Sequence, residues 1–363
     1  MTDPRGWTPV VRGAFHRGEG GHRARGAGPT VADVDENVDE NVDKNTTEGA
    51  TEGRAGHPGE GTPPSGGGPA GAGAHGSLAG QVALVTGCGK PDGMGQGIAR
   101  ELAARGAALV LTDREPRGVA NERQRRRGEA PPSGLAEFAG DLGRAGARVE
   151  TVLADISVRD DVDRLFDTVR EVHGRLDILV NNAAAPQGVD RQDVEDVPDE
   201  AFDLQIDVNV RGTYWMCRSA VPLMRAQGYG RIVNVSSMAG LTAAPGSVAY
   251  SASKAAVIGM TRALSMDLGP WGITVNAVCP GLVATSRAVL DPVADLDLAQ
   301  AMAARGRAIP VGRVGMPADI GALVAFLASP DAGYVTGQAI PVDGGGLSPF
   351  PLRRPEPVLG SAV

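Results

Sequence analysis

Two side chains suited to proton transfer, Tyr250 and Lys254, stand four residues apart in a stretch with helical periodicity. This spacing places both on one face of a helix. Only three of the 35 basic residues are lysines, so a lysine at this position indicates a role that an arginine does not fill. An ammonium group beside a phenol favours the phenolate and lowers the tyrosine pKa from about 10. The pair therefore predicts a general acid and base.

A glycine-rich segment, residues 87–97, lies between the apolar run Val82–Thr86 and a helical pattern. Glycines at such a junction let the backbone approach a pyrophosphate, and the helix N-terminus supplies free N–H groups and a positive dipole end. Asp113 ends the next apolar run, where a carboxylate accepts from a ribose 2′-hydroxyl and repels the 2′-phosphate of NADP. The sequence thus predicts a dinucleotide, with NAD(H) favoured. Lys90 and Arg114 are cations that can receive that phosphate, which leaves NADP(H) open.

Short apolar runs alternate with helical patterns along residues 78–347, as expected of elements that position such a site. The expected strands are Val82–Thr86, Ala108–Asp113, Val149–Asp155, Leu176–Asn181, Arg231–Ser237, Ile273–Val278 and Ala339–Val342. The expected helices are Gly95–Arg105, Val158–Val172, Phe202–Gln227, Val248–Leu268 and Ala318–Ala328. Strands that are apolar throughout favour a parallel sheet covered on both faces. We predict an α/β fold, a Rossmann-like doubly wound parallel seven-stranded sheet in a single domain, with its ligand at the carboxyl ends of the strands.

The remaining segments lack this alternation. Residues 1–77 are rich in Gly and carry a Val-Asp-Glu-Asn repeat, so we interpret them as a low-complexity, disordered extension; an acidic tether for a partner is the alternative. Residues 117–133, rich in Arg and Pro, form an insertion that we expect to be a disordered surface loop. The alternative is contact with the adenosine end of the cofactor or with a neighbouring subunit. Residues 348–363 form a C-terminal tail.

Composition excludes several classes of function. Four of the five histidines lie in the first 80 residues and the three cysteines are far apart, so we predict no metal site and no histidine triad. The net charge of −8 argues against nucleic-acid binding. No run reaches the roughly 20 apolar residues of a membrane span. We expect a cytoplasmic protein that binds neither nucleic acid nor a membrane.

An ordered set of motifs resembles a known family. The set comprises Thr86-Gly87 with Gly93-x-Gly95, Asn181-Asn182-Ala183, Asn209, Ser237 thirteen residues before Tyr250, Tyr250-x-x-x-Lys254, and Pro280-Gly281 followed by Thr285. It resembles the single-domain branch of the short-chain dehydrogenase/reductase family over residues 80–346. Two departures stand out. Five residues, Cys88 to Asp92, replace the usual three in the glycine motif, and Ala184 replaces a glycine after Ala183.

This resemblance implies roles for individual residues. Tyr250 would exchange the proton at the substrate oxygen, Ser237 would hydrogen-bond that oxygen, Lys254 would bind the nicotinamide ribose and tune Tyr250, and Asn209 would anchor a water that relays protons. The implied cofactor-binding residues are Gly87, Gly93, Met94, Gly95, Asp113, Arg114, Asp155, Ile156, Asn182, Ala183, Tyr250, Lys254, Pro280, Gly281, Val283 and Thr285. The resemblance also implies a homotetramer or homodimer built through the helices containing Asn209 and Tyr250 and through the last strand.

The expected activity is NAD(P)-dependent interconversion of a small-molecule secondary alcohol and ketone. The alternatives are an NADPH-dependent 3-oxoacyl-thioester (acyl-carrier-protein) reductase and, less favoured, a non-catalytic cofactor-binding protein. Enoyl reduction is disfavoured because relatives with that activity space their Tyr and Lys more widely. Residues 282–309 would cover a mainly apolar substrate pocket, which suits a lipid-like, alicyclic or aryl ketone, an acyl thioester or a polyketide intermediate. The sequence favours none of these substrates and does not set the reaction direction, although Asp113 and NAD lean towards alcohol oxidation.

Overall fold

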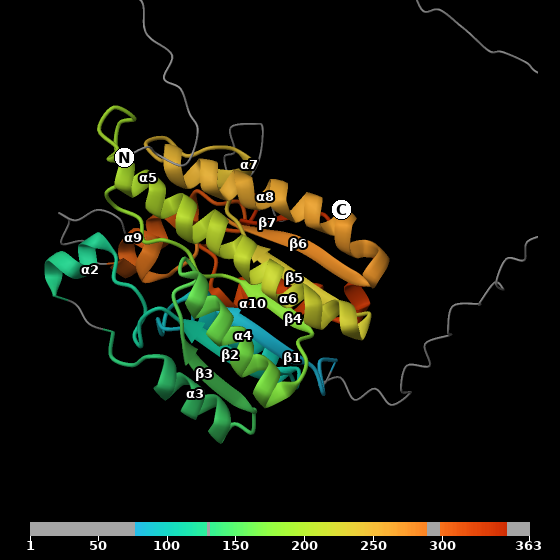
Figure 1. Cartoon of the computed structure of the whole chain (residues 1–363). Helices are drawn as coiled ribbons and strands as arrows, with labels where there is room; N and C mark the ends of the chain where they lie inside the picture. Colours follow the sequence, from blue (N-terminus) through green and yellow to red (C-terminus); the bar gives the residue numbers. More distant parts are fainter. Residues whose placement is uncertain (1–76, 129–130, 289–297, 347–363) are drawn as a thin grey trace, which may run out of the picture. The chain divides into compact units, whose positions relative to one another are not determined.

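A computed structural model describes residues 77–128, 131–288 and 298–346. Its centre is one parallel sheet of seven strands in the order β3-β2-β1-β4-β5-β6-β7 (Figure 1). The strands are β1 Val82–Thr86, β2 Ala108–Asp113, β3 Val149–Leu153, β4 Ile178–Asn181, β5 Gly230–Val235, β6 Ile273–Pro280 and β7 Ala339–Val342. All seven occupy predicted positions, and the predicted doubly wound α/β fold is confirmed.

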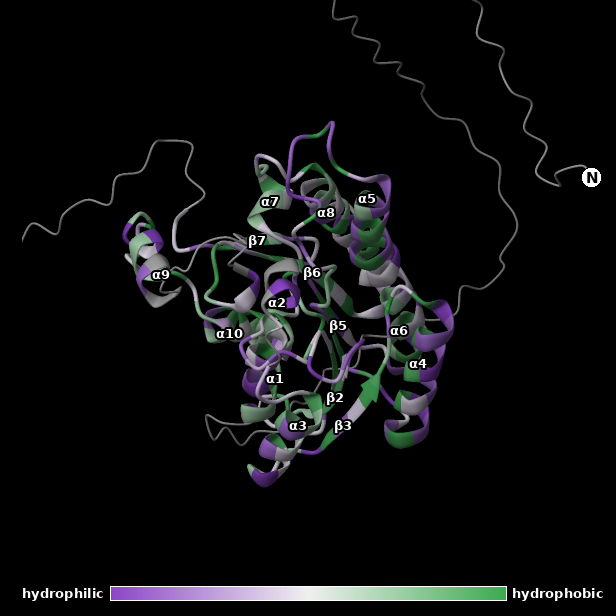
Figure 2. Cartoon of the chain, turned by 90° about the vertical axis from the view of Figure 1, so that its left-hand side faces the viewer, coloured by the Kyte–Doolittle hydropathy of each residue, from purple (hydrophilic) through white to green (hydrophobic). Residues whose placement is uncertain are grey.

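Helices cover both faces of the sheet, which explains why its central strands are apolar throughout. Figure 2, which views the sheet nearly edge-on, shows α1, α3 and α10 on one side and α4, α6 and α8 on the other. The helices are α1 Met94–Ala104, α2 Glu122–Arg127, α3 Leu135–Arg144, α4 Arg159–His173, α5 Asp199–Ile206, α6 Thr213–Gln227, α7 Met238–Leu241, α8 Val248–Leu268, α9 Leu298–Arg307 and α10 Pro317–Leu327.

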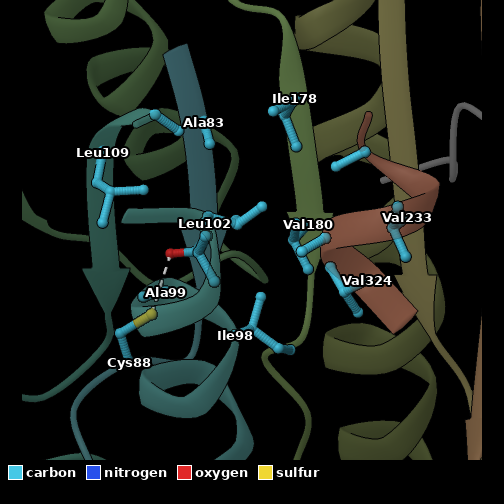
Figure 3. Packing of buried hydrophobic residues seen from close by; sticks show 14 of the residues in the cluster. Ala83, Cys88, Ile98, Ala99, Leu102, Leu109, Ile178, Val180, Val233 and Val324 are labelled. Carbon is cyan, nitrogen blue, oxygen red and sulfur yellow. Dashed lines mark hydrogen bonds between the residues drawn. The ribbon is translucent and has the colours of Figure 1, made fainter. Parts of the chain in front are cut away.

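The core behind the glycine-rich segment is formed by α1, α10 and the central strands. Ile98, Leu102 and Val324 are fully buried against strand residues such as Val180 (Figure 3). Fully burying one such side chain stabilises the fold by about 1.5–3 kcal/mol. The two helices approach closely because Gly97 has no side chain: a Cβ there would lie 2.5 Å from Pro317. The position and direction of α1 are therefore set by packing.

The sheet order places the ligand-binding edge. The chain moves outward from β1 through β2 to β3, then returns to β4 on the other side of β1. The loops after β1 and β4 consequently leave the sheet in opposite directions and open a crevice at its carboxyl edge. The glycine-rich segment follows β1, and Asn181-Asn182-Ala183 begins at the end of β4.

Several elements differ from the sequence prediction. The single helix expected over Phe202–Gln227 is α5, a π-helical turn at Asp207–Gly212 and then α6. Helices α3 and α9 were not predicted, nor was α2, which lies inside the insertion. Residues 1–76 and 347–363 lie outside the described residues, so their interpretation stays a prediction. No helix in the described part of the chain is both long and apolar enough to cross a membrane.

Candidate active site

The turn after β1 requires glycine at two positions. Gly87 has a φ of +76°, and a Cβ on it would lie 2.8 Å from Asn182 Nδ2. A Cβ on Gly95 would lie 2.2 Å from the Gly87 carbonyl oxygen. Asn182 Nδ2 donates to the carbonyls of Thr86 and Gly87 at 2.8 and 3.1 Å, which joins the loops after β1 and β4. Any larger residue at 87 or 95 would displace this turn.

The glycine turn leads into an uncapped helix. Gly93 is the N-cap of α1 and makes no side-chain hydrogen bond, and the first turn of α1 contains no acidic residue. The first N–H groups of a helix have no partner within the helix and carry its positive dipole end. The turn after β1 therefore presents an anion-binding end of α1 to the cleft.

Asp113 stands at the end of β2, as predicted, and its carboxylate already has backbone partners. Its Oδ2 accepts from the Gly89 N–H at 2.8 Å, and burial raises its pKa. Arg114, the next residue, pairs with Glu115 at 2.9 Å and lies 3.7 Å from Asp155. Thr112 Oγ1 is buried and has no hydrogen-bond partner among the described residues. This corner of the cleft is thus polar and predominantly acidic.

The longer glycine loop and the insertion after β2 pack against each other. A Cβ on Gly89 would lie 2.4 Å from the Gly118 backbone nitrogen. Lys90 Nζ donates to Gln124 Oε1 at 2.7 Å, and Asn121 and Gln124 form a reciprocal capping box at the start of α2. The described part of the insertion is therefore not the disordered loop that we expected. The pattern Asn121-x-x-Gln124 is the signal that sequence reasoning missed.

Tyr250 and Lys254 lie one helical turn apart on α8, and both line the cleft. Lys254 is 3% exposed, donates from Nζ to the Val235 carbonyl at 2.8 Å, and lies 5.7 Å from the centroid of the Tyr250 ring. Burial, together with the positive charge of Arg287, lowers the pKa of Lys254 to about 7. The predicted pair is therefore assembled at the carboxyl end of β5, and its ammonium readily loses its proton in this state.

Ser237 occupies the N-cap of α7, where its Oγ accepts from the Ala239 N–H at 3.1 Å. Helix α7 packs on α8 because Gly240 has no side chain: a Cβ there would lie 2.7 Å from the backbone of Lys254. The preceding serine, Ser236, lines the cleft and donates from Oγ to the Lys254 carbonyl at 2.8 Å. Ser237 is thus held next to α8 but is not part of the cleft lining.

Asn209 lies inside the π-helical turn and is 1% exposed. Its Oδ1 accepts from the Ala185 N–H at 2.9 Å, while Nδ2 donates to Gln205 Oε1 at 2.8 Å and to Ser253 Oγ at 2.9 Å. Ser253 Oγ in turn donates to the Tyr250 carbonyl at 2.8 Å. Asn209 therefore ties the loop after β4 to α8, and both of its amide hydrogens are already used.

The segment after β6, residues 282–288, crosses the mouth of the cleft, and we call it the strap. Val283 pairs with Gly315, and the Ser286 backbone N–H and Oγ both donate to the carboxylate of Asp92. Asn121 Nδ2 donates to the Ser286 carbonyl at 3.0 Å. Arg287 donates to the carbonyls of Ala184 and Ala185 at 2.9 and 2.7 Å. Sequence reasoning missed Asp92, Asn121, Ser286 and Arg287 because their partners are distant in the chain.

Most predicted site residues meet in one cleft at the carboxyl edge of the sheet. Those lining it are Gly87, Gly93, Met94, Asp113, Arg114, Asp155, Ile156, Asn182, Ala183, Tyr250, Lys254 and Thr285. Those outside its lining are Gly95, Asn209, Ser237, Pro280, Gly281 and Val283. Gly281 directly follows β6 and packs against Asp343, where a Cβ would lie 2.7 Å from the Asp343 Cβ. These six residues therefore do not contact the cleft directly in this structure.

The cleft fits a dinucleotide. Gly87 and Gly95 leave space that a side chain would fill, and the N-terminus of α1 is uncapped. Thr112 Oγ1 and Asn182 Oδ1 are buried polar atoms of lining residues with no partner in the described structure. Buried polar atoms are normally satisfied, so these two indicate a missing polar ligand. A pyrophosphate and its riboses match this combination of backbone approach, helix end and unused hydrogen-bonding atoms.

Comparison with known proteins identifies relatives over nearly the whole of the folded part. A family model described as enoyl-(acyl carrier protein) reductase matches residues 87–346. Oxidoreductase UcpA of Salmonella typhimurium is 36% identical over 278 residues, which are 76% of this chain and 97% of the relative. The short-chain reductase protein NovJ of Streptomyces niveus is 38% identical over 269 residues, 73% of this chain and 93% of the relative.

Two further similar proteins are a human relative and a protein of known crystal structure. Human dehydrogenase/reductase SDR family member 4 is 34% identical over 268 residues, which are 74% of this chain and 88% of the relative. The crystal structure of levodione reductase superposes with a TM-score of 0.64 at 30% identity, covering 74% of this chain and 98% of that one. The similarities therefore extend to sequence as well as to fold.

Proposed function

Because the chain belongs to the short-chain dehydrogenase/reductase family, NAD(P)-dependent enzymes acting on CH–OH groups of small molecules, we propose that it interconverts a secondary alcohol and a ketone. The observation that carries this proposal is the Tyr250 and Lys254 pair, which lines the same cleft as the glycine turn of β1. The lining beside this pair is largely apolar, with Ala184, Pro186 and Val235, which supports an apolar substrate.

The proposed chemistry divides between cofactor and protein. A bound nicotinamide supplies or accepts the hydride at the substrate carbon. Tyr250 gives its hydroxyl proton to the substrate oxygen in reduction and removes that proton in alcohol oxidation. The ammonium form of Lys254 stabilises the resulting phenolate, since a positive charge nearby favours the charged form of a phenol. Negative charge that develops on the substrate oxygen is thus met by a proton donor and a neighbouring cation.

Ser237 and Asn209 support this reaction in different ways. We propose that the Ser237 hydroxyl donates to the substrate oxygen, because its Oγ accepts from Ala239 and its own hydrogen remains for donation. We propose Asn209 as a positioning residue for Ala185 and for Ser253 beside Lys254. Its amide hydrogens are occupied, so a proton-relaying water would have to bind an acceptor atom of Asn209.

NAD(H) is the cofactor that we propose. The support is the acidic corner after β2, where the half-buried carboxylate of Asp113 would repel a 2′-phosphate. Arg114 is engaged by Glu115 and Asp155, which further disfavours a third anion there. Lys90 is the opposing feature, because it lines the cleft and its ammonium donates to the neutral Gln124 amide rather than to a carboxylate. NADP(H) is therefore the alternative outcome of the test below.

Residues of the glycine turn, of the helix α1 N-terminus and of the loops after β2, β3 and β4 would hold this cofactor. The turn and the helix end suit the pyrophosphate, through Gly87, Gly93 and Met94. Asp113 suits the adenosine ribose, and Asp155 with Ile156 borders the same end of the cleft. We propose Asn182, Lys254 and Thr285 for the nicotinamide side of the cofactor, because they line the same cleft as Tyr250.

The matching family model also supports a second candidate, reduction of a 3-oxoacyl group on acyl carrier protein, because its description names that carrier. The same description names enoyl reduction, which the spacing of four residues between Tyr250 and Lys254 disfavours. A non-catalytic cofactor-binding protein would not need a buried lysine beside a tyrosine in the cleft. Assay with 3-oxoacyl, enoyl and simple ketone substrates under NADH and NADPH separates these candidates.

Cofactor choice is tested by fluorescence titration of the full chain with NADH and NADPH. The Asp113→Asn variant removes the charge but keeps an oxygen for the Gly89 N–H. We expect the parent to bind NADH at least 10-fold more tightly than NADPH and the variant to lose most of this preference. Asp160→Asn, an exposed carboxylate on α4, is the matched control. Preference of the parent for NADPH would contradict the NAD assignment and favour a role for Lys90.

Turnover tests the proposed role of Tyr250. The Tyr250→Phe variant lacks the hydroxyl that exchanges the proton, so kcat for ketone reduction should fall by about 10²–10⁴-fold while NADH affinity stays within a few-fold. Tyr214→Phe, at a half-exposed tyrosine on α6, is the matched control and should keep parental kcat. A Tyr250→Phe enzyme with kcat within twofold of the parent would refute this assignment.

A further inference from the structure

One cation in the cleft, Arg287, has no role in the function proposed above. It lies in the strap, lines the cleft and donates from Nη1 and Nη2 to the carbonyls of Ala184 and Ala185. A guanidinium has five N–H donors, and these two bonds use only two of them. Among the residues that the structure describes, no carboxylate forms an ion pair with Arg287.

The strap places Arg287 near the N-terminus of α1. Ser286, its neighbour, donates from both its backbone N–H and its Oγ to Asp92, the residue directly before the helix N-cap Gly93. The side chain of Arg287 reaches across to the loop after β4. Arg287 therefore bridges two parts of the cleft wall: the strap, which is hydrogen-bonded to Asp92 ahead of α1, and the loop after β4.

Four cations line this cleft. Arg114 pairs with acidic residues, whereas Lys90, Lys254 and Arg287 have no ion-pair partner within the described ranges. They are close enough that the charge of Arg287 lowers the pKa of both lysines, after the larger effect of burial. Like charges gathered in a partly buried cleft repel one another, and an anion removes that repulsion.

The carboxylates of the cleft are engaged elsewhere. Asp92 accepts from Ser286, Asp113 accepts from the Gly89 N–H, and Asp155 lies near Arg114 and accepts from Ser157. Meanwhile Thr112 Oγ1, fully buried on the cleft wall, has no partner in the described structure. The charge balance and the unused polar atom both indicate that an anionic, hydrogen-bonding ligand completes this region.

We propose that Arg287 is a cofactor-binding residue whose guanidinium pairs with the pyrophosphate of the dinucleotide. This assignment rests on the proposed function, since it requires a dinucleotide in the cleft. The planar fork of arginine matches two phosphate oxygens, which a lysine at the same place does not. The strap thereby contributes a charged contact opposite the backbone N–H groups of α1, and the cofactor is held from both sides.

Calorimetric titration with ADP-ribose, which has the pyrophosphate but no nicotinamide, tests Arg287 without any turnover. Arg287→Met should weaken ADP-ribose binding by about 10- to 100-fold, the loss of a hydrogen bond to a charged group. Binding of adenosine, which has no phosphate, should be unchanged. Arg287→Lys should recover part of the ADP-ribose affinity, and thermal unfolding checks that both variants are folded. Arg218→Met, an exposed cation on α6 outside the cleft, is the matched control and should keep ADP-ribose binding within about threefold.

Each remaining outcome has a defined meaning. ADP-ribose binding that stays within twofold in Arg287→Met, with normal binding by the parent, would overturn the Arg287 assignment and leave the dinucleotide function standing. The same result with a raised KM only for ketones that carry a carboxylate would also overturn it, by assigning Arg287 to a substrate anion. A parent protein that binds neither NADH, NADPH nor ADP-ribose would instead refute the proposed function itself.

Discussion

The protonation state of Lys254 is set by its surroundings in the folded chain. The ammonium is almost completely removed from water, Arg287 faces it with a like charge, and its hydrogen-bond partner is the neutral Val235 carbonyl. Cys279 has the opposite, smaller effect on the Lys254 pKa, and burial raises the pKa of its own thiol. The pKa of Lys254 therefore falls to about 7 in the cofactor-free protein.

This shift predicts a dependence of stability on pH. The unfolded chain holds the lysine proton up to its ordinary pKa of 10.5, whereas the folded chain releases it near 7. Between these values the unfolded state binds more protons, so the contribution of Lys254 to stability rises with pH. Below pH 7 both states are protonated and the cost of the buried charge is complete. Replacing the lysine with a neutral side chain removes that cost.

We therefore expect the Lys254→Met variant to gain more stability relative to the parent at low pH than at high pH. The difference in Tm between variant and parent should be more positive at pH 6.5 than at pH 9, by at least about 2 °C, which corresponds to roughly 1 kcal/mol in a domain of this size. Thermal unfolding of cofactor-free protein measures it. Arg218→Met, an exposed cation on α6, should show no such change. A Lys254→Met difference that is constant across this range would mean that Lys254 keeps its proton when folded.

The shared helix face of Tyr250 and Lys254 could be predicted from the sequence, because a spacing of four residues lies within one helix. Gly87 and Asp113 were predictable for a similar reason, since each directly follows or ends a recognisable strand. Arg287 was not, because its partners, the Ala184 and Ala185 carbonyls, are about a hundred residues earlier. Contacts of backbone carbonyls across the fold leave no mark in residue type or spacing.

At the scale of elements, the extended glycine loop, the start of α2 and the strap form one connected unit. Lys90 binds Gln124, Asn121 binds the Ser286 carbonyl, and Ser286 binds Asp92. The insertion thus contacts the glycine loop on one side and the strap on the other. Because Asn121 also lines the cleft, the insertion helps to form the wall of the binding site.

Asn121 has two functions in this unit that can be separated. Its Oδ1 caps α2, and its Nδ2 reaches the strap. Asn121→Ser keeps a capping oxygen but lacks the amide N–H, whereas Asn121→Ala removes both. We expect hydrogen exchange in 282–288 to be about fivefold faster in both variants. We expect exchange in 119–128 to be faster only in Asn121→Ala, since loss of an N-cap costs about 1 kcal/mol. Unchanged exchange of the strap in both variants would show that the contact does not hold it.

Strands and helices with a clear apolar pattern were predicted correctly. Elements whose conformation depends on tertiary contacts were not. The strands were located within a few residues because each is a short apolar run between turns. The π-helical turn at Asp207–Gly212 was invisible, because one extra residue in a turn leaves the helical pattern of its neighbours intact. Helix α2 has an Arg-rich sequence with no apolar stripe, so only its capping box marks it.

At the scale of the molecule, apolar side chains remain exposed on the helices of one face. Tyr214 on α6 is 45% exposed, and Val248 and Met266 on α8 are 45% and 79% exposed. On the β7 side, Phe326 of α10 is 42% exposed and Tyr334 is fully exposed. Single exposed apolar residues are normal, but several on neighbouring helices are typical of an association surface.

We therefore expect the chain to self-associate as a homotetramer or homodimer through α6 and α8. Light scattering after size exclusion should give a mass of two or four chains at micromolar concentration. The double variant Tyr214→Arg with Met266→Glu places charges in the contact, where an unpaired desolvated charge is costly, so the mass should decrease. Val194→Glu, at an exposed valine in a loop, is the control and should keep the parental mass. A monomeric parent, or an oligomer that withstands the double variant, would contradict association through these helices.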